Sequence, residues 1–375
     1  MNFSIKKISI VSCISGILIF SLCLISCEEN GVSESAATIQ YHRSAQLTNI
    51  YNNEISVLTK AFINETELLQ QSAITFQQST TSENLDATIA LWKSSQSLWK
   101  QLELYDVGAI ENTFISSEIN FWPTNEIFIN DNISGTATIN EALITSLGAS
   151  SKGISAIEYL LFSGDENTQI LNSFTTSENA ERRKQYLTGL TQNLSAKSKE
   201  LNDHWENYEE DFTSSLENGI SGTQNQMINA MITLIEEIII TKLGNPLGDT
   251  NGGIIEAERL EGYYSEFSKE IIEQHVISLE RCYLGDFSQT PFRIGFDDFL
   301  ILSGREILAN QISDQFAVCK EELASISGSL EDEIIKNPDA VNDLKDTFRD
   351  LLVLVKVDMA NILGSTITFN DNDGD

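Results

Sequence analysis

The most informative chemical group in this sequence is a single carboxylate inside an apolar helical run. Glu158 stands in the segment from Gly153 to Phe162, where almost all of its neighbours are apolar. Ser155 precedes it by three residues, so the two side chains share one face of a helix. A glutamate is rarely buried unless it is paired or binds a metal. Glu158 therefore belongs either to a polar site between helices, compensated by a metal or a cationic partner, or to an ordinary hydrogen-bonded pair.

Few other residues could complete a metal site. The chain has three histidines, and no His-Glu-x-x-His motif is present. His42 lies near the start of the predicted helical region, and His204 and His275 lie in amphipathic helical segments, where a solvated or interhelical hydrogen bond is the expected role. A hydrolytic zinc site built on histidines is therefore not expected. An oxygen-rich site that uses Glu158 and other carboxylates for a harder cation remains open.

The elements that position Glu158 are predicted to be helices. Apolar residues recur at spacings of three, four and seven, which is the pattern of amphipathic helices. We expect helices over about 50–76, 85–102, 181–212, 226–243, 255–284, 297–327 and 339–363. Pro123 interrupts the pattern and favours an extended Trp122. The fold class is predicted to be all-α, with two packed helical bundles over 38–216 and 225–363.

The charge of the chain excludes some partners. It contains 55 Asp and Glu against 23 Lys and Arg, a net charge of −32. Nucleic acid is not expected as a partner, because affinity for phosphates requires clustered Lys and Arg. Residues 364–375 form an acidic tail that we expect to be solvated. The oligomeric state is not predicted.

The first residues are predicted to be an export signal. Lys6 and Lys7 precede an apolar run that ends in Leu24-Ile25-Ser26-Cys27, similar to a bacterial lipobox. We expect residues 1–26 to be a lipoprotein signal peptide, Cys27 to carry the lipid and 27–37 to be a tether. The alternative is an uncleaved signal anchor. The membrane is thus one expected partner, and the expected location is the outer membrane, on its periplasmic face or at the cell surface.

Two further cysteines fall in the helical region. Cys282 and Cys319 are both in register with apolar neighbours, so both are expected to face a core. A disulfide between them and a pair of buried free thiols are both compatible with the sequence.

Several segments together resemble the imelysin family. Gly153-x-Ser155-x-x-Glu158 resembles its Gly-x-His-x-x-Glu motif, with serine at the histidine position. The stretch from Asn120 to Glu126 is similar to its Asp-x-Trp-Pro-x-(Asp/Asn)-Glu element. The other matching stretches are Trp92 to Trp99, Arg182 to Leu187, Lys242 to Gly248, Tyr263 to Ser265, and the ending from Leu363, which resembles bacteroidal members.

The resemblance implies a two-domain all-α fold and an envelope protein linked to iron uptake. It implies a divalent or ferric ion as cofactor, with Glu158 as a metal ligand, and an outer-membrane iron-uptake system as partner. Its motif and pocket residues would be Gly153, Ser155, Glu158, Trp122, Arg183 and Tyr264. A serine hydroxyl is a much poorer ligand than imidazole for Zn, Cu or Fe.

We therefore predict a lipid-anchored, non-catalytic binding component in the acquisition of iron or another metal. The first alternative is a metal-dependent endopeptidase in which Glu158 is a ligand or a base, with Ser155 nearby. The second is a scaffold or adhesion lipoprotein without a small ligand.

Overall fold

The chain is helical throughout the part that the structure describes. The computed structural model describes residues 36–164, 167–287 and 293–368. Every long regular element in these ranges is a helix and none is a strand, which confirms the predicted all-α class. The predicted signal peptide, Cys27 and the end of the acidic tail lie outside the described residues. Among the described helices, none is long and apolar enough to cross a membrane.

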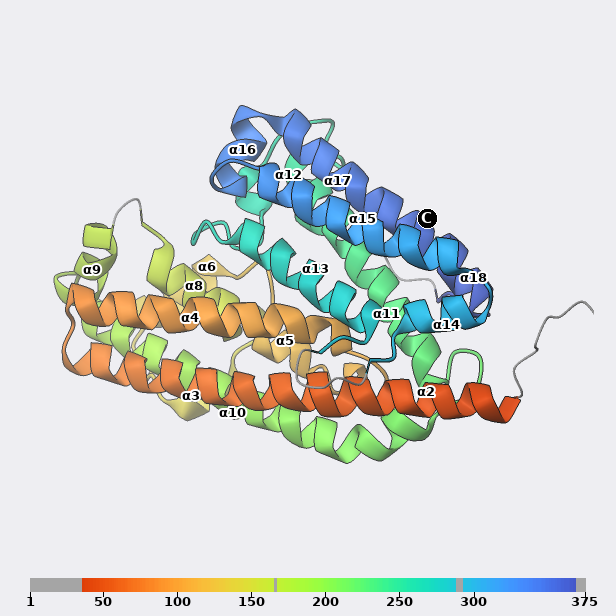
Figure 1. The fold of residues 1–375 in the computed structure, drawn as a ribbon. Helices are drawn as coiled ribbons and strands as arrows, with labels where there is room; N and C mark the ends of the chain where they lie inside the picture. Colours follow the sequence, from red (N-terminus) through yellow and green to blue (C-terminus); the bar gives the residue numbers. More distant parts are fainter. Residues whose placement is uncertain (1–35, 165–166, 288–292, 369–375) are drawn as a thin grey trace, which may run out of the picture. The chain divides into compact units, whose positions relative to one another are not determined.

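Three long helices form the first layer of the fold. After α2 and a short π-helical turn, α3 and α4 run side by side, and α3 packs on its other side against α10 (Figure 1). The apolar positions of α3 at Leu58, Phe62, Leu69 and Phe76 are all buried, as their spacing predicts. The bounds are α2 Ala36–Ile50, η1 Tyr51–Ile55, α3 Ser56–Gln78, α4 Ser82–Leu102 and α10 Ala180–Ser214.

Short elements fill the chain between α4 and α10. Among them α8 packs against both α10 and α4, and all its residues except the last are buried. The motif that contains Glu158 is therefore enclosed by the two long helices. The bounds are η2 Glu103–Tyr105, η3 Glu111–Thr113, α5 Ile115–Ile119, α6 Glu126–Ser134, α7 Glu141–Ser146, η4 Ala149–Ser151, α8 Gly153–Phe162 and α9 Asn167–Thr175.

The second group of helices follows α10. Its α13 packs against α4, its α11 contacts η2, and α15 pairs with α17. From His42 onward the chain forms one compact unit. The division into bundles over 38–216 and 225–363 stays a prediction. The bounds are α11 Thr223–Glu237, η5 Ile238–Gly244, α12 Asn245–Leu247, η6 Ala257–Arg259, α13 Ser268–Leu284, α14 Phe296–Leu302, α15 Glu306–Ser325, α16 Leu330–Lys336, α17 Pro338–Leu352, η7 Val353–Met359 and α18 Ala360–Ile362.

Two of the predicted helices differ from the structure in their bounds. The predicted helix over 255–284 begins only at Ser268, and the one over 297–327 is broken into α14 and α15. Gly262 and Gly304 stand in these breaks with φ of +88° and +72°. A left-handed backbone interrupts the helical hydrogen bonding, and glycine adopts it at little cost.

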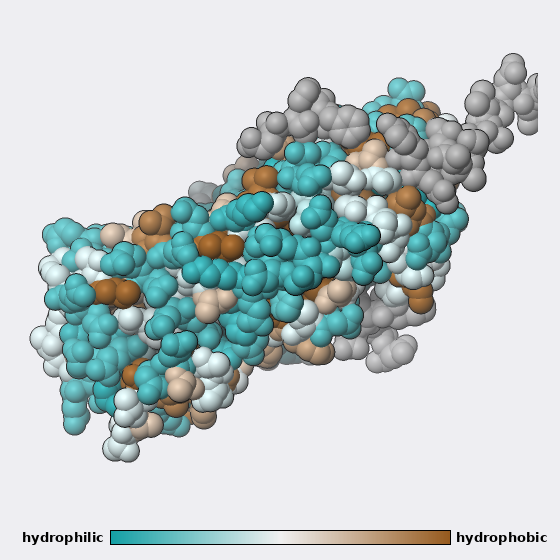
Figure 2. All heavy atoms as spheres, turned by 90° about the horizontal axis from the view of Figure 1, so that it is seen from below, coloured by the Kyte–Doolittle hydropathy of each residue, from teal (hydrophilic) through white to brown (hydrophobic). Residues whose placement is uncertain are grey.

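The exterior carries most of the charge. The face shown in Figure 2 is mainly hydrophilic, with small separate hydrophobic areas.

Candidate functional site

Gly153 brings the start of α8 against the end of α5. Its φ is +78°, and a Cβ there would lie 2.3 Å from the backbone oxygen of Ile119. Only glycine permits this approach without displacing the backbone. The approach sets Ser155 beside Asn120, the residue that follows α5, and Ser155 Oγ donates a hydrogen bond of 2.7 Å to Asn120 Oδ1. The motif glycine thus determines which group Ser155 meets.

Replacing Gly153 with alanine should therefore cost more than backbone strain alone. Gly252 is the matched control, because its φ is +79° and no atom lies within 4 Å of its Cβ position. We expect Gly252→Ala to lower the free energy of unfolding by about 1–2 kcal/mol. Gly153→Ala should add about 1–3 kcal/mol for the forced contact. Urea denaturation of both variants measures the difference, and equal losses would show that the contact with Ile119 is unimportant.

Asn120 connects Ser155 to a buried network of charges. Asn120 Nδ2 donates to Glu261 Oε1 over 2.9 Å, and Lys100 Nζ reaches the same oxygen at 2.5 Å. Lys242 Nζ binds the other oxygen, Oε2, at 2.6 Å. Burial by itself would raise the pKa of Glu261, but the charges of Lys100 and Lys242 outweigh it and lower the pKa to about 2. Glu261 is therefore an ionised carboxylate with both oxygens occupied.

The network continues to a buried histidine. Lys100 Nζ also binds Glu103 Oε1 at 2.6 Å, and His275 Nε2 lies 2.8 Å from Glu103 Oε2. Burial lowers the pKa of His275 to about 4, so its ring is neutral at pH 7 and Nε2 donates to the carboxylate. Burial opposes ionisation of Glu103, yet Lys100 and His275 hold its pKa well below the usual value. The network therefore joins α4, η2 and α13.

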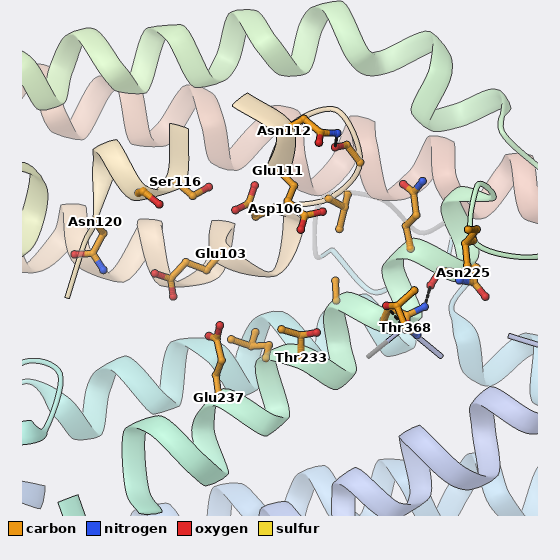
Figure 3. Close-up of a pocket in the computed structure, with 18 of the residues that line it drawn as sticks. Glu103, Asp106, Glu111, Asn112, Ser116, Asn120, Asn225, Thr233, Glu237 and Thr368 are labelled. Atoms are coloured by element: carbon orange, nitrogen blue, oxygen red, sulfur yellow. Dashed lines mark hydrogen bonds between the residues drawn. The ribbon is translucent and has the colours of Figure 1, made fainter. Parts of the chain in front are cut away.

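A pocket opens next to this network. It has a volume of about 770 Å³ and lies between the segment from Trp99 to Asn120 and helix α11. Asn120 and Glu103 belong both to its wall and to the buried network. Figure 3 shows Glu103 and Glu237 pointing toward each other from the two sides of the pocket.

The wall of the pocket is acidic. Its four carboxylates are Glu103, Asp106, Glu111 and Glu237, and the described residues that line it include no Lys, Arg or His. Burial raises the pKa of Asp106 and of Glu237. Removal from water disfavours these negative charges, and no cation of the chain forms a salt bridge with either of them within the described residues.

Glu158 faces a different set of partners from Ser155. Its side chain is only 4% exposed, and Oε1 accepts from the backbone N of Ser265 at 3.1 Å and from Ser265 Oγ at 2.7 Å. Burial raises the pKa of Glu158 to about 7, although the hydrogen bonds from Ser265 favour its ionised form. The nearby charges of Glu261 and Glu331 raise it further. Glu158 is thus a buried carboxylate that titrates near neutral pH.

The remaining residues predicted from the resemblance lie around α8. Arg183 donates to the backbone oxygen of Leu160 at 2.9 Å, at the far end of the helix from Ser155. Tyr264 donates to Glu126, and its ring meets that of Tyr159 edge to face. Trp122 is half-buried in the loop after Asn120. These contacts hold α8 in place and do not bring Arg183 into an ion pair with Glu158 within the described chain.

The motif residues do not form an assembled metal centre. The Ser155 hydroxyl donates a hydrogen bond to Asn120, and Glu158 Oε1 accepts a hydrogen bond from the Ser265 hydroxyl. Across the described ranges, no group of three His, Cys, Asp or Glu side chains is arranged to hold a metal ion. The metal-ligand role of Glu158 stays a prediction. Cys282 and Cys319 are buried free thiols.

The sequence did not single out the residues of the network. The stretches that carry the resemblance contain or adjoin Lys100, Glu103, Lys242 and Glu261. In a sequence, however, a buried charged residue cannot be distinguished from one on the surface. The signal that could have been used is Asn120, which occupies the aspartate position of the Trp-Pro element.

A match to a family model decides the family of the chain. The family model for imelysin, a peptidase-type family, matches residues 59–355. The chain belongs to the imelysin family. A comparison with functionally curated proteins finds no match.

Two solved structures share the imelysin fold of this chain. One is an imelysin-like protein from Psychrobacter arcticum 273-4, with a TM-score of 0.69 and 18% identity over 88% of this chain and 98% of that one. The other is provisionally described as an iron-regulated protein A precursor from Parabacteroides distasonis ATCC 8503. Its TM-score is 0.72 and its identity 15%, over 89% of this chain and 97% of that one. At these identities the likeness shows the fold.

Two positions of the resemblance described above lie in contact. Ser155 stands where the resembling motif has histidine, and Asn120 stands where the resembling Trp-Pro element has aspartate. Their two side chains hydrogen-bond to each other, and both are neutral.

Proposed function

We propose that this imelysin is a non-catalytic ligand-binding component of iron acquisition in the cell envelope, and that the acidic pocket is its ligand site. The observation that carries the proposal is the hydrogen bond from Ser155 to Asn120, because Asn120 lines the pocket. The position that defines the imelysin motif therefore lies one hydrogen bond behind the pocket wall.

The chemistry of the motif supports binding rather than peptide cleavage. A nucleophilic serine requires a neighbouring base, and the side chain that accepts the proton of Ser155 is an amide oxygen. An amide does not act as a base at neutral pH. Glu158, the other candidate of the motif, is enclosed and hydrogen-bonded to Ser265. Neither residue is placed to activate a water or a peptide.

The proposed location and the role in iron acquisition rest on two further observations. Cys27 follows a lipobox-like sequence, which supports a lipid anchor. The Parabacteroides protein with the same fold is provisionally described as iron-regulated. Both features fit a protein that delivers or presents a ligand to an outer-membrane uptake system.

The proposal is tested in a strain that lacks this gene and grows under iron limitation. We expect slow growth that the wild-type gene restores. The double variant Asp106→Asn/Glu237→Gln should fail to restore it, because it neutralises two pocket carboxylates without changing their size. The matched control Asp314→Asn/Glu321→Gln makes the same charge change at exposed positions of α15 and should restore growth.

Three other results bear on the same proposal. Cys27→Ala should move the protein out of the membrane fraction, and its retention there would contradict the lipid anchor. Normal growth of the deletion strain under iron limitation would overturn the role in acquisition. A chelator-sensitive cleavage of peptides that is lost in Glu158→Gln would establish the endopeptidase alternative instead.

A further inference from the structure

We propose that the turn between α14 and α15 is a second membrane contact, which inserts apolar side chains into the same lipid surface that holds the anchor at Cys27. The turn comprises residues 301–307 and is called the apolar turn below. The inference rests on the lipid anchor of the proposed function and does not involve the acidic pocket. It adds the part of the folded chain that meets the membrane.

The apolar turn projects from the fold. All seven of its residues are exposed, which is the longest such run in the described ranges. Gly304 has a φ of +72°, and no atom lies within 4 Å of its Cβ position. A left-handed glycine reverses the chain between the two helices, and open space surrounds it. The turn is therefore accessible to a partner.

Three of the exposed side chains in this turn are large and apolar. Ile301 is 46% exposed, Leu302 is 49% exposed and Ile307 is 78% exposed. Single exposed apolar residues are common on protein surfaces, but a group of three on one projecting turn indicates a surface that is covered in use. Leu300 and Ala309, on either side of the turn, are buried and fix it to the core.

The apolar turn is structurally close to the point where the compact unit begins. That unit begins at His42, in α2. Asn49, also in α2, donates from Nδ2 to the backbone oxygen of Gly285 at 2.9 Å. Gly285 follows α13 and lies against Ile294, because a Cβ on it would be 2.2 Å from the Ile294 oxygen. Since α14 begins two residues after Ile294 and is short, the turn lies within roughly 35 Å of His42.

The chain before His42 is long enough to bring the apolar turn to the membrane. Nine residues separate Cys27 from Ala36, the first residue of α2, and they span at most about 30 Å when extended. The first helical residues of α2 add about 9 Å before His42. A lipid at Cys27 therefore permits the turn to reach the surface of the same bilayer. It also holds the turn close to that surface, which raises the effective concentration of a weak contact.

The charge of the apolar turn agrees with a lipid surface. The protein has a net charge of −32, so an anionic membrane repels most of its exterior. The turn carries one basic residue, Arg305, and one acidic residue, Glu306, and thus no net charge. The long side chain of Arg305 can extend to the phosphates of the lipid headgroups while its neighbours enter the acyl region.

The small size of the apolar turn favours a membrane over a second protein. A stable protein interface buries about 800 Å² on each partner, which is more than three partly exposed side chains offer. Insertion into a lipid surface requires no complementary partner surface, and its strength follows from the apolar area that is buried. A projecting turn with a few apolar side chains fits this requirement.

A fluorescent probe at Leu302→Cys tests the inference in the lipidated protein, reconstituted into vesicles of phosphatidylethanolamine and phosphatidylglycerol. The probe is the NBD group, whose emission strengthens and moves to shorter wavelength in an apolar environment. Cys282 and Cys319 are buried, so the probe reacts at the turn. We expect emission at shorter wavelength than in detergent-free buffer, and quenching by lipids that carry a spin label in the acyl chain.

Two further substitutions measure the contribution of the apolar side chains. Adding Ile307→Ser to the labelled protein should lower the ratio of inserted to free turn about 10-fold, since burial of a largely exposed isoleucine is lost. The lifetimes of the probe report this ratio. The matched control is Ile127→Ser, because Ile127 is 77% exposed but lies on α6, which packs against α8 and α10. It should leave the ratio unchanged.

A probe that stays unshifted on a vesicle-bound chain would overturn the inference and leave the anchor in place. A shift that grows with the ratio of protein to lipid, without quenching by the spin-labelled lipids, would show that a second copy covers the turn, and would also overturn it. A chain that stays out of the membrane fraction of the cell would overturn the anchor and the inference together. Growth under iron limitation tests the acidic pocket separately, so failure of the iron role would leave the result for the turn unchanged.

Discussion

Glu261→Gln should lower the free energy of unfolding by about 3–5 kcal/mol, because it removes the salt bridge of the buried Lys242 and leaves the buried Lys100 with Glu103 as its one salt-bridge partner among the described residues. Lys100 is fully buried and Lys242 is only 7% exposed, and each contacts one oxygen of Glu261. Glutamine is nearly the same size as glutamate, so the loss of stability comes from the missing charge and not from a cavity. Chemical denaturation at pH 7 measures this loss.

The control for this variant is an exposed ion pair. Lys336 and Asp332 have side chains that are 65% and 62% exposed. Asp332→Asn should therefore cost less than about 1 kcal/mol. A similar small loss for Glu261→Gln would show that Lys100 and Lys242 are solvated or neutral in the folded protein.

The contribution of Glu261 also has a defined pH dependence. Its pKa is lowered to about 2 in the folded chain, so its stabilising effect is present above the unfolded value near 4.5 and is lost as the pH falls toward 2. The difference in stability between the wild type and Glu261→Gln should narrow below about pH 4. A difference that stays constant from pH 7 to pH 3 would contradict an ionised Glu261.

Glu158→Gln should have the opposite effect and stabilise the protein above neutral pH. The pKa of Glu158 is raised to about 7 by burial, whereas in the unfolded chain it lies near 4.5. Between these values the folded protein holds a proton that the unfolded chain has lost, so stability falls as the pH rises from about 4.5 to 7. The glutamine side chain does not ionise. The free energy of unfolding of Glu158→Gln should therefore exceed that of the wild type by roughly 3 kcal/mol at pH 8 and equal it at pH 4.

The measurement is a pair of denaturation curves, at pH 8 and pH 4, for the wild type and Glu158→Gln. Glu321→Gln is the control, because Glu321 is exposed and should change stability by little at either pH. A loss of stability at pH 8 would mean that the ionised form of Glu158 is required, as in a site that holds a cation. That result would favour the metal-ligand prediction for Glu158.

The two buried carboxylates, Glu261 and Glu158, differ in their charge at neutral pH because their partners differ. Glu261 is ionised because two lysines face it, while Glu158 is poised near neutrality because hydroxyl and amide donors are its only partners in the described chain. The first joins helices that are distant in sequence. The second changes its protonation near neutral pH.

The sequence by itself determined the helical class and the family of the protein. Apolar spacing of three and four residues is a local property, since it depends only on how a helix turns. The lone Glu158 among apolar neighbours and the serine at the histidine position were equally visible in one segment. These features predicted that the motif is buried and that a histidine-based metal site is not expected.

Only the tertiary structure decided which charges meet. Lys100 and Glu261 are 161 residues apart, and Glu103 and His275 are 172 apart. In the sequence each looks like a residue of a solvated helix face, and Glu261 falls in a segment that the spacing predicted to be helical. The helices α4, α11 and α13 must pack before these side chains lose water and acquire partners. Burial and counter-charge arise together at that point, which is why the pocket and its network could not be predicted from local patterns.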